Sequence, residues 1–258
     1  MQIPKANRFV RPARAALAVL LLPVGACPAG VVVGRLVVDG DAPTPSPLEP
    51  GRDACCQRAA PVDESVVVGE EGGLANAVVS VEPRRGEPPL PDRAAAPAEP
   101  AVLTNRDCAF RPRVLIARVG QPLVLANDDP TMHNVSIAMA RNGPVNVVVA
   151  PDGRRRVPLE RPERRPVSVS CNVHRFMQGW LLVRDDPWAA VTDADGAFEL
   201  PELPAGSWRL RFWREGAPMV GLRVADGQTD ARGEVLVEVP ESGAADLGEI
   251  AVAAEGLR

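Results

Sequence analysis

The sequence predicts an all-β protein built as a sandwich or barrel. From residue 30 onward the chain consists of short runs rich in Val, Ile and Leu, separated by Gly, Pro and Asp. Regularly spaced short runs bounded by turn residues are typical of β-sandwiches and barrels. No stretch shows the sustained 3.6-residue period of a long helix. At 258 residues with 46% hydrophobic content, the chain can form one large domain or two small ones.

The first 27 residues predict an export signal. Four basic residues, Lys5, Arg8, Arg11 and Arg14, precede an apolar stretch that ends before Pro23. This stretch is too short to span a bilayer. The tetrapeptide at 24–27 resembles a bacterial lipobox, in which Cys27 would be acylated and become the first mature residue. The alternative is ordinary signal-peptidase cleavage near Ala26 or Ala29. We therefore expect a periplasmic or extracellular bacterial protein, attached to a membrane only through a lipid on Cys27, if at all.

The charge balance argues against a nucleic-acid partner. The full chain has a formal charge of −4. Removal of the basic leader would take the mature chain to about −8. Proteins that bind nucleic acid need a basic face, so we expect no such partner.

The predicted strands follow one another from residue 31 to residue 239. Their residue ranges are 31–40, 74–83, 113–120, 122–128, 133–139, 145–150, 165–171, 179–185, 196–200, 207–213 and 233–239. Two Pro-rich passages, 39–53 and 86–101, interrupt the series. Their composition is typical of surface connections or linkers.

The exported compartment limits how the cysteines can be used. With Cys27 and Cys171 set aside, Cys55, Cys56 and Cys108 remain, an odd number where thiols tend to oxidise. A bond between adjacent cysteines is strained, so we expect Cys108 to pair with either Cys55 or Cys56. Of these two pairings, we predict the Cys56–Cys108 disulfide.

Strand alternation directs His133 and Cys171 toward the core. His133 shares a face with Val135, Ile137 and Met139, and Cys171 shares one with Val167 and Val169. A second histidine, His174, follows Cys171 by three residues, and Met177 follows by three more. Two imidazoles, one thiolate and one thioether are the ligand set of a blue-copper site, whereas zinc seldom takes a methionine. Each residue alone could be ordinary core packing, but the chain has only two histidines and both lie in this pattern.

These motifs resemble the cupredoxin family, and the ligand loop resembles the amicyanin type. The resemblance covers roughly residues 100–186 and includes "AFRPRVLIARVGQPLVLANDD", the "HNV" at 133–135 and "CNVHRFMQGWLLV" at 171–183. It implies a Greek-key β-sandwich that holds one type 1 copper, with His133, Cys171, His174 and Met177 as ligands. It also implies that Asn134 ties the two ligand loops together near the thiolate.

The ligand loop departs from the family at one position. Many such loops carry Pro after the second histidine, where this chain has Arg175. We expect Arg175 to place a positive charge beside an exposed edge of His174, which would favour docking to an acidic redox partner. The additional Met132 in the first loop is interpreted as a surface or packing residue.

The C-terminal part resembles a second family. Residues 190–216 are similar to the carboxypeptidase regulatory-like, transthyretin-like sandwiches, and the runs at 34–43 and 74–83 resemble that family's opening strands. In the run at 207–213, Trp208, Leu210 and Phe212 share one face and Arg209, Arg211 and Trp213 the other. We therefore expect a discontinuous sandwich of residues 28–99 and 187–258, with the copper domain, 100–186, inserted into it.

The predicted function is one-electron transfer by a type 1 copper protein that serves a redox partner and is not an enzyme. Copper oxidases and nitrite reductases need further histidine clusters, and none remain once His133 and His174 are used. Two alternatives stay open, a copper carrier or buffer that uses the same ligands, and a non-redox sandwich module that binds another molecule.

Overall fold

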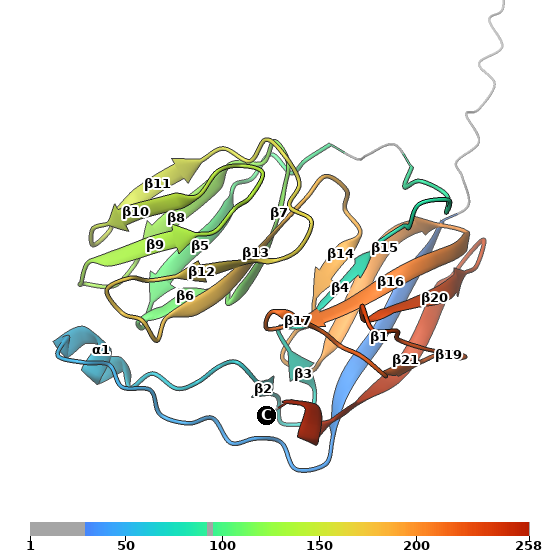
Figure 1. The fold of residues 1–258 in the computed structure, drawn as a ribbon, viewed down its shortest axis with the longest axis horizontal. Coiled ribbons are helices and arrows are strands. Elements are labelled where there is room, and N and C mark those ends of the chain that lie inside the picture. The colour runs from blue at the N-terminus through green and yellow to red at the C-terminus, as the bar shows by residue number, and fades with distance from the viewer. Residues whose placement is uncertain (1–28, 92–94, 258) are drawn as a thin grey trace, which may run out of the picture.

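The structure, a computed structural model, describes residues 29–91 and 95–257. The predicted leader with Cys27 lies outside these residues. Within them the chain is almost entirely β, apart from the helix α1 (Ala54–Ala59) and a 3-10 turn at Ala254–Leu257 (Figure 1). The predicted all-β sandwich class is confirmed. None of the described helices has the length and apolar character needed to cross a membrane.

Residues 101–184 form the first of two sandwiches, named sandwich A. Its larger sheet has the strand order β10-β9-β12-β13-β7 and its smaller sheet the order β11-β8-β5-β6. The larger sheet comprises β7 (Val114–Arg118), β9 (His133–Ile137), β10 (Val145–Val149), β12 (Val167–Ser170) and β13 (Gln178–Arg184). The smaller comprises β5 (Ala101–Arg106), β6 (Ala109–Arg111), β8 (Leu123–Asn127) and β11 (Arg154–Val157). Apolar side chains from both sheets form one core, among them Phe110, Leu125, Ile137 and Leu181.

The register of the larger sheet brings two predicted site residues to the same end. Strands β9 and β12 are antiparallel neighbours, and Ser170 pairs with Ser136. His133 is the first residue of β9, and Cys171 directly follows the last residue of β12. Because antiparallel neighbours run in opposite directions, the start of one strand lies beside the end of the other.

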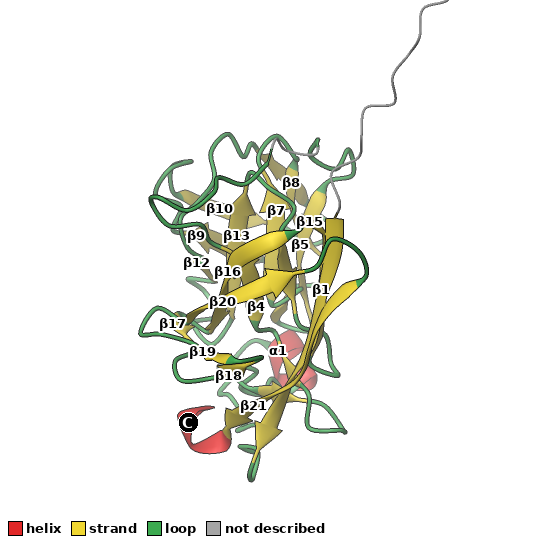
Figure 2. Cartoon of the chain, turned by 90° about the vertical axis from the view of Figure 1, so that its right-hand side faces the viewer, coloured by secondary structure: helices red, strands yellow, loops and turns green. Residues whose placement is uncertain are grey.

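The remaining strands form the second sandwich, named sandwich B. One sheet has the order β15-β1-β21, and the other has β14-β4-β16-β17 with β20 paired to β16. Their bounds are β1 (Ala29–Asp39), β15 (Ala197–Pro204), β21 (Ala244–Ala253), β4 (Val78–Val81), β14 (Ala189–Val191), β16 (Gly206–Arg214), β17 (Ala217–Pro218) and β20 (Glu234–Val239). Two small ribbons complete it, β2 (Val67–Val68) with β3 (Leu74–Ala75) and β18 (Arg223–Val224) with β19 (Gly227–Gln228). Figure 2 shows β1 and its parallel neighbour β21 side by side in this sandwich.

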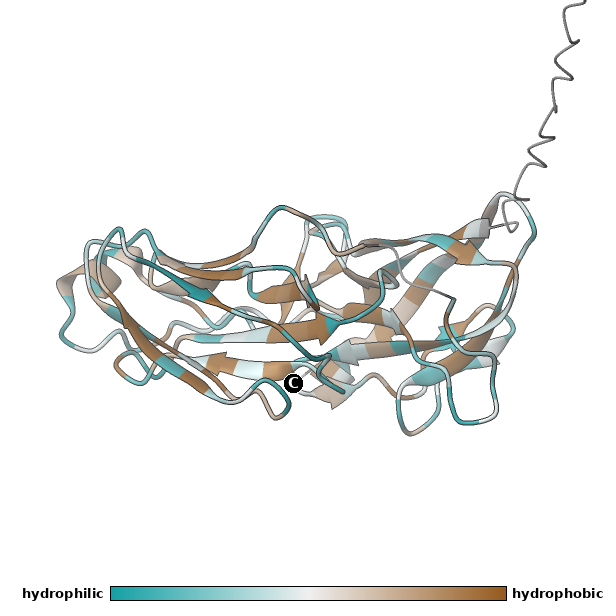
Figure 3. Ribbon diagram, turned by 90° about the horizontal axis from the view of Figure 1, so that it is seen from above, coloured by the Kyte–Doolittle hydropathy of each residue, from teal (hydrophilic) through white to brown (hydrophobic). Residues whose placement is uncertain are grey.

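The two sandwiches have separate cores and a small apolar contact between them. The core of sandwich B draws its buried side chains from residues 32–81 and 188–257, and that of sandwich A from 101–183 together with Cys56. A third cluster joins Val78 and Trp213 of sandwich B to Val114 and Leu182 of sandwich A. Figure 3 shows the hydrophobic residues concentrated along the strands of both sandwiches.

The segment between β1 and β2 leaves sandwich B and reaches the end of sandwich A where His133 and Cys171 lie. Figure 1 shows this excursion as two long arms with α1 at the tip. The arms are held together by the Leu48 N–H, which donates to the Pro61 carbonyl at 2.9 Å, and by the Asp63 N–H, which donates to the Ser46 carbonyl at 2.8 Å. The Pro-rich passage 39–53 is therefore not a simple linker, because it delivers α1 and the cap residue Asp53 to the other sandwich.

Candidate metal centre

Three predicted ligands converge at the end of sandwich A. One donor atom each from His133, Cys171 and His174 lies within 4.8 Å of the other two, and all three residues are buried. The two imidazole Nδ1 atoms are 3.1 Å apart, and the Cys171 Sγ is 3.9 Å from the Nδ1 of His174. An ion bound at about 2.0–2.3 Å by two nitrogens and a sulfur would hold them about 3.5–4 Å apart in a trigonal plane. The observed spacing therefore suits one metal ion.

The Cys171 sulfur is held by two backbone donors. The N–H groups of Asn134 and His174 each point at Sγ from 3.4 Å. The ligand loop closes on itself through the Met177 N–H, which donates to the His174 carbonyl at 2.9 Å. Hydrogen bonds to a cysteine sulfur are one of the means by which proteins adjust the redox properties of a thiolate-bound metal.

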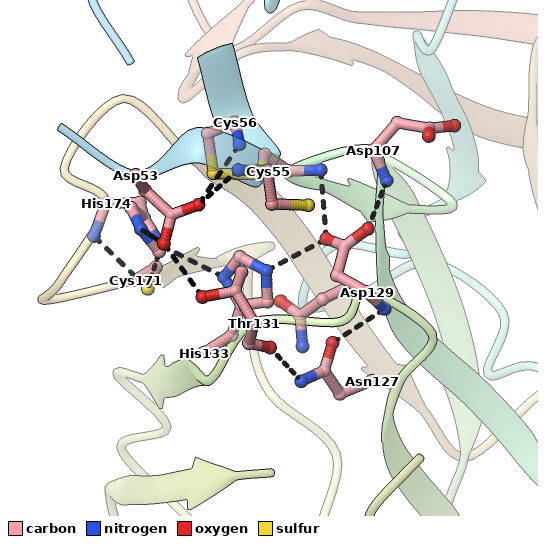
Figure 4. A network of polar contacts seen from close by, with 12 residues as sticks. Asp53, Cys55, Cys56, Asp107, Asn127, Asp129, Thr131, His133, Cys171 and His174 are labelled. Carbon is pink, nitrogen blue, oxygen red and sulfur yellow. Dashed lines mark hydrogen bonds and ion pairs between the residues drawn. A yellow bond between two sulfur atoms is a disulfide. The ribbon is translucent and has the colours of Figure 1, made fainter. Parts of the chain in front are cut away.

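Each imidazole presents its other nitrogen to a carboxylate (Figure 4). The Nε2 of His133 is 2.8 Å from Oδ2 of Asp129, and both side chains are buried. The Nε2 of His174 is 3.6 Å from Oδ2 of Asp53, the residue that caps α1. The hydrogen bond to Asp129 orients the His133 ring and favours the proton on its Nε2. At 3.6 Å, Asp53 is at ion-pair distance from His174 and makes no hydrogen bond with it.

Burial and hydrogen bonding set the charge state of two of these groups. Burial lowers the pKa of His133, although the nearby Asp129 carboxylate acts in the opposite direction. His133 is therefore a neutral imidazole at neutral pH, the form that binds metal. The hydrogen bond from the Thr131 hydroxyl lowers the pKa of Asp53, which keeps that carboxylate ionised.

The donor chemistry fits a bound cation. The two Nδ1 atoms face one another across 3.1 Å, and that of His174 also faces the Cys171 sulfur. An imidazole protonated on Nε2, the form that the Asp129 contact favours for His133, presents Nδ1 as a free acceptor that can bind a cation. The site is thus complementary to a soft metal ion held by two nitrogens and one sulfur.

The two candidate methionines have different surroundings. Met177 is 2% exposed and packs in the same core cluster as Cys171. Met132 is 55% exposed. The interpretation of Met132 as a surface residue is therefore confirmed, whereas Met177 is buried at the end of the ligand loop.

Asn134 joins the elements around the thiolate. Its Oδ1 accepts the N–H of Asn172 in the ligand loop at 3.1 Å. Its Nδ2 donates to the carbonyl of Val147 on β10 at 3.1 Å and to the side chain of Asn146 at 2.6 Å. The side chain therefore links the first ligand strand, the ligand loop and the neighbouring edge strand.

The remaining cysteines near the site do not extend the ligand set. Cys56 and Cys108 form a disulfide in the structure, so neither sulfur is a free thiolate. The two other His, Cys and carboxylate groupings at this end of sandwich A each contain one of these bonded sulfurs. Cys55 is a half-buried free thiol whose pKa is raised by burial, with Asp129 and Asp53 adding to the effect.

The sequence pattern did not reveal the carboxylates that contact the imidazoles. Asp129 lies four residues before His133, and its two oxygens also accept the N–H groups of Asp107 and Cys108 at 2.7 and 3.0 Å. This separation of four residues is the sequence signal from which the contact between Asp129 and His133 could have been predicted. Asp53 is far away in sequence and had no comparable signal.

The expected exposed edge of His174 is wrong. The His174 side chain is only 7% exposed, because Asp53 and α1 lie over its outer nitrogen. Arg175 is exposed, as expected, but the imidazole beside it is not. The excursion from sandwich B contributes to this difference together with Phe176 of the ligand loop, whose ring centroid lies 5.9 Å from that of His174.

Comparisons with known proteins show weak likeness to copper proteins. No family model matches the chain, and no curated protein matches it. A reduced Cu(I) form of an amicyanin mutant is 18% identical, with 33% of this chain and 81% of that chain covered and a TM-score of 0.29. A purple cupredoxin from Nitrosopumilus maritimus is 19% identical, with 32% and 98% covered and a TM-score of 0.28. The copper-containing nitrite reductase of Thermus scotoductus SA-01 is also 19% identical, with 40% and 25% covered and a TM-score of 0.28.

These identities and TM-scores assign neither a family nor a function to the chain. What the structure itself defines is an all-β protein with a buried cluster of two histidines and one cysteine at one end of a sandwich.

Proposed function

We propose that this protein is a type 1 copper protein that carries single electrons outside the cytoplasm. Its ligands would be His133, His174 and Cys171, with the thioether of Met177 as a weak fourth. The observation that supports this most directly is the convergence of two imidazole Nδ1 atoms and a thiol sulfur, with Asp129 bonded to the outer nitrogen of His133 and Asp53 beside that of His174. Sulfur ligands hold Cu(I) and imidazoles suit Cu(II), so bound copper would supply a one-electron couple.

The residues around the site are arranged to change little during electron transfer. The His133 imidazole is oriented through its Nε2 by Asp129, and two N–H groups hold the sulfur. Asp53 lies beside the Nε2 of His174. All three side chains are buried, so water contributes little rearrangement. A rigid, dry ligand set keeps the cost of switching oxidation states low, which favours an electron carrier over an enzyme that must bind a substrate at the metal.

The disulfide supports the proposed location. Structural disulfides persist in oxidising compartments, and the Cys56–Cys108 bond lies close to the site. We propose that the mature protein acts in the periplasm or extracellular space with a redox protein as partner, and that Cys27 carries its lipid anchor.

Metal analysis with spectroscopy tests the proposed function. The purified mature protein is expected to bind one copper per chain, with an intense blue absorption and a narrow copper hyperfine splitting when oxidised. Cys171→Ser should abolish the blue colour because it removes the thiolate. Met132→Leu should keep the colour, because the sulfur that it removes is exposed and is not a proposed ligand, although it lies next to His133 in the sequence. A colourless protein that gives up copper readily would contradict electron transfer.

A further inference from the structure

Residues 53–59 lie over the outer side of the candidate metal centre and are named the cover. Its first residue, Asp53, faces the Nε2 of His174 and also accepts the Thr131 hydroxyl at 2.8 Å. Thr131 belongs to the loop that leads into His133, so one carboxylate contacts both ligand loops. Figure 4 shows Asp53 between His174 and Thr131.

The cover is bonded covalently to the same end of sandwich A. Cys56 is fully buried and its sulfur is joined to Cys108. The Cys108 N–H donates to Asp129, whose same oxygen contacts the Nε2 of His133. The disulfide therefore connects the cover to the carboxylate that orients the first histidine, while Asp53 contacts the second.

Besides the disulfide and the contacts of Asp53, Cys55 and Ala59 pack against the core of sandwich A, and Glu64 in the following arm pairs with Arg111 of β6. A cavity of about 350 Å³ lies beside them, lined by Ala59, Cys108, Phe176 and Met177 among others. The arms that carry the cover come from sandwich B and pair with each other between Pro47 and Val62. Without the disulfide, a long excursion of this kind would open at a lower free energy than the core strands.

We propose that the cover is a disulfide-tethered closure of the metal centre, in which Asp53 is a positioning residue for His174 and the Cys56–Cys108 bond slows metal exchange. This inference rests on the proposed function, since it requires a metal among the ligands. Its physical basis is that the three donors are buried beneath the cover, so an ion can reach or leave them only when the cover moves. A tether that limits this motion retards release without adding a ligand.

Two variants test separately the positioning role of Asp53 and the tethering role of the Cys56–Cys108 disulfide. Asp53→Asn keeps an effective helix cap, because Asn and Asp cap equally well, but it removes the charge that faces His174. Cys56→Ser combined with Cys108→Ser removes the tether and leaves no unpaired thiol at either position. Asp128→Asn is the control, because Asp128 is a nearby carboxylate paired with the exposed Arg106 at 2.8 Å.

The release experiment uses Co(II) bound to the full mature protein and a chelator in excess. Loss of the cobalt–thiolate absorption is followed in time. We expect release to be about tenfold or more faster from Asp53→Asn and from the double serine variant than from wild type, and within about twofold of wild type for Asp128→Asn. A phosphine reduces the disulfide of the wild-type protein but leaves Co(II) unreduced. Wild-type protein treated in this way should release cobalt as fast as the double serine variant. It takes the place of that variant in the comparison if the variant does not fold.

A second measurement isolates the positioning role. In the copper form, Asp53→Asn should raise the reduction potential more than Asp128→Asn does, because it removes a negative charge beside a ligand imidazole. Release rates and potentials equal to wild type in metal-loaded variants would overturn the closure and leave the metal site standing. A wild-type protein that binds neither Co(II) nor Cu(II) would instead overturn the proposed function, and the closure with it.

Discussion

At the scale of single residues, the site depends on which nitrogen of each histidine is free. His133 and His174 each direct Nε2 to a carboxylate and Nδ1 toward the other imidazole, and the Nδ1 of His174 also faces the Cys171 sulfur. The sequence pattern indicated that His133, Cys171 and His174 would lie together, because strand alternation and loop spacing are local properties. It did not predict Asp53, because its contact with His174 depends on a distant segment folding back.

Replacement of Asp129 by Asn should weaken the site and the fold together. The two carboxylate oxygens of Asp129 accept hydrogen bonds from His133, Asp107 and Cys108, whereas Asn has only one acceptor oxygen. At least one buried donor therefore loses its partner. We expect a loss of about 1.5–3 kcal/mol in the free energy of unfolding, and metal binding weaker by about 10–100-fold. Chemical denaturation and competition titration measure the two effects. Unchanged affinity in a folded Asp129→Asn protein would show that Asp129 does not orient the ring.

At the scale of elements, strand patterns were more informative than loop composition. The predicted inward face of His133, Val135, Ile137 and Met139 is confirmed, since all four are buried. The passage 39–53 shows the opposite case, because Pro-rich composition predicts an extended segment and says nothing about where it goes. In sandwich B, the turn before β20 is likewise joined to the loop after β4 by side chains, through an ion pair of Arg84 with Asp230.

This ion pair should make sandwich B sensitive to acid. Burial raises the pKa of Asp230, but the hydrogen bonds from Arg84 and from the N–H groups of Arg232 and Glu234 outweigh it and lower the pKa from 3.8 to about 2. A carboxyl with a depressed pKa stabilises the folded state above its ordinary pKa and loses that contribution as the pH falls toward the folded value. Wild type should therefore be more stable than Asp230→Asn at neutral pH.

The stability difference between wild type and Asp230→Asn should shrink as the pH falls from 3.8 to about 2. Urea unfolding of both proteins across this range measures it. A difference that stays constant with pH would mean that the charge of Asp230 contributes nothing.

At the scale of the whole molecule, the site of sandwich A is assembled with help from sandwich B. The cover reaches across from β1 and β2 (Figure 1). The sandwiches also meet through Trp213, whose ring packs edge-on against Trp180 with centroids 5.1 Å apart. A buried ionic cluster adds to this junction, since Arg184 pairs with Glu82 of the other sandwich at 2.5 Å.

Replacement of Trp213 by Ala should destabilise this junction. Its side chain is 7% exposed and packs with Val78, Val114 and Leu182, so truncation removes a large apolar contact. We expect a loss of about 3–5 kcal/mol, whereas Leu236→Ala, at an exposed position on β20, should cost less than about 0.5 kcal/mol. Thermal unfolding measures both. Equal effects would show that Trp213 does not hold the sandwiches together.

The sequence by itself determined the β class, the inward direction of His133 and Cys171, and the compact loop that brings His174 and Met177 near them. These features follow from a period of two along strands and from short spacings, which are local. Only the tertiary structure decided that Asp129 bonds to the His133 imidazole, that Asp53 and the cover lie over His174, and that Trp213 is buried at the junction despite its place among arginines on its strand. The contacts of Asp53, the cover and Trp213 join residues far apart in the chain or in different sandwiches, and local pattern carries no information about which distant surfaces meet. Asp129 is only four residues from His133, but spacing alone does not say which groups its carboxylate accepts.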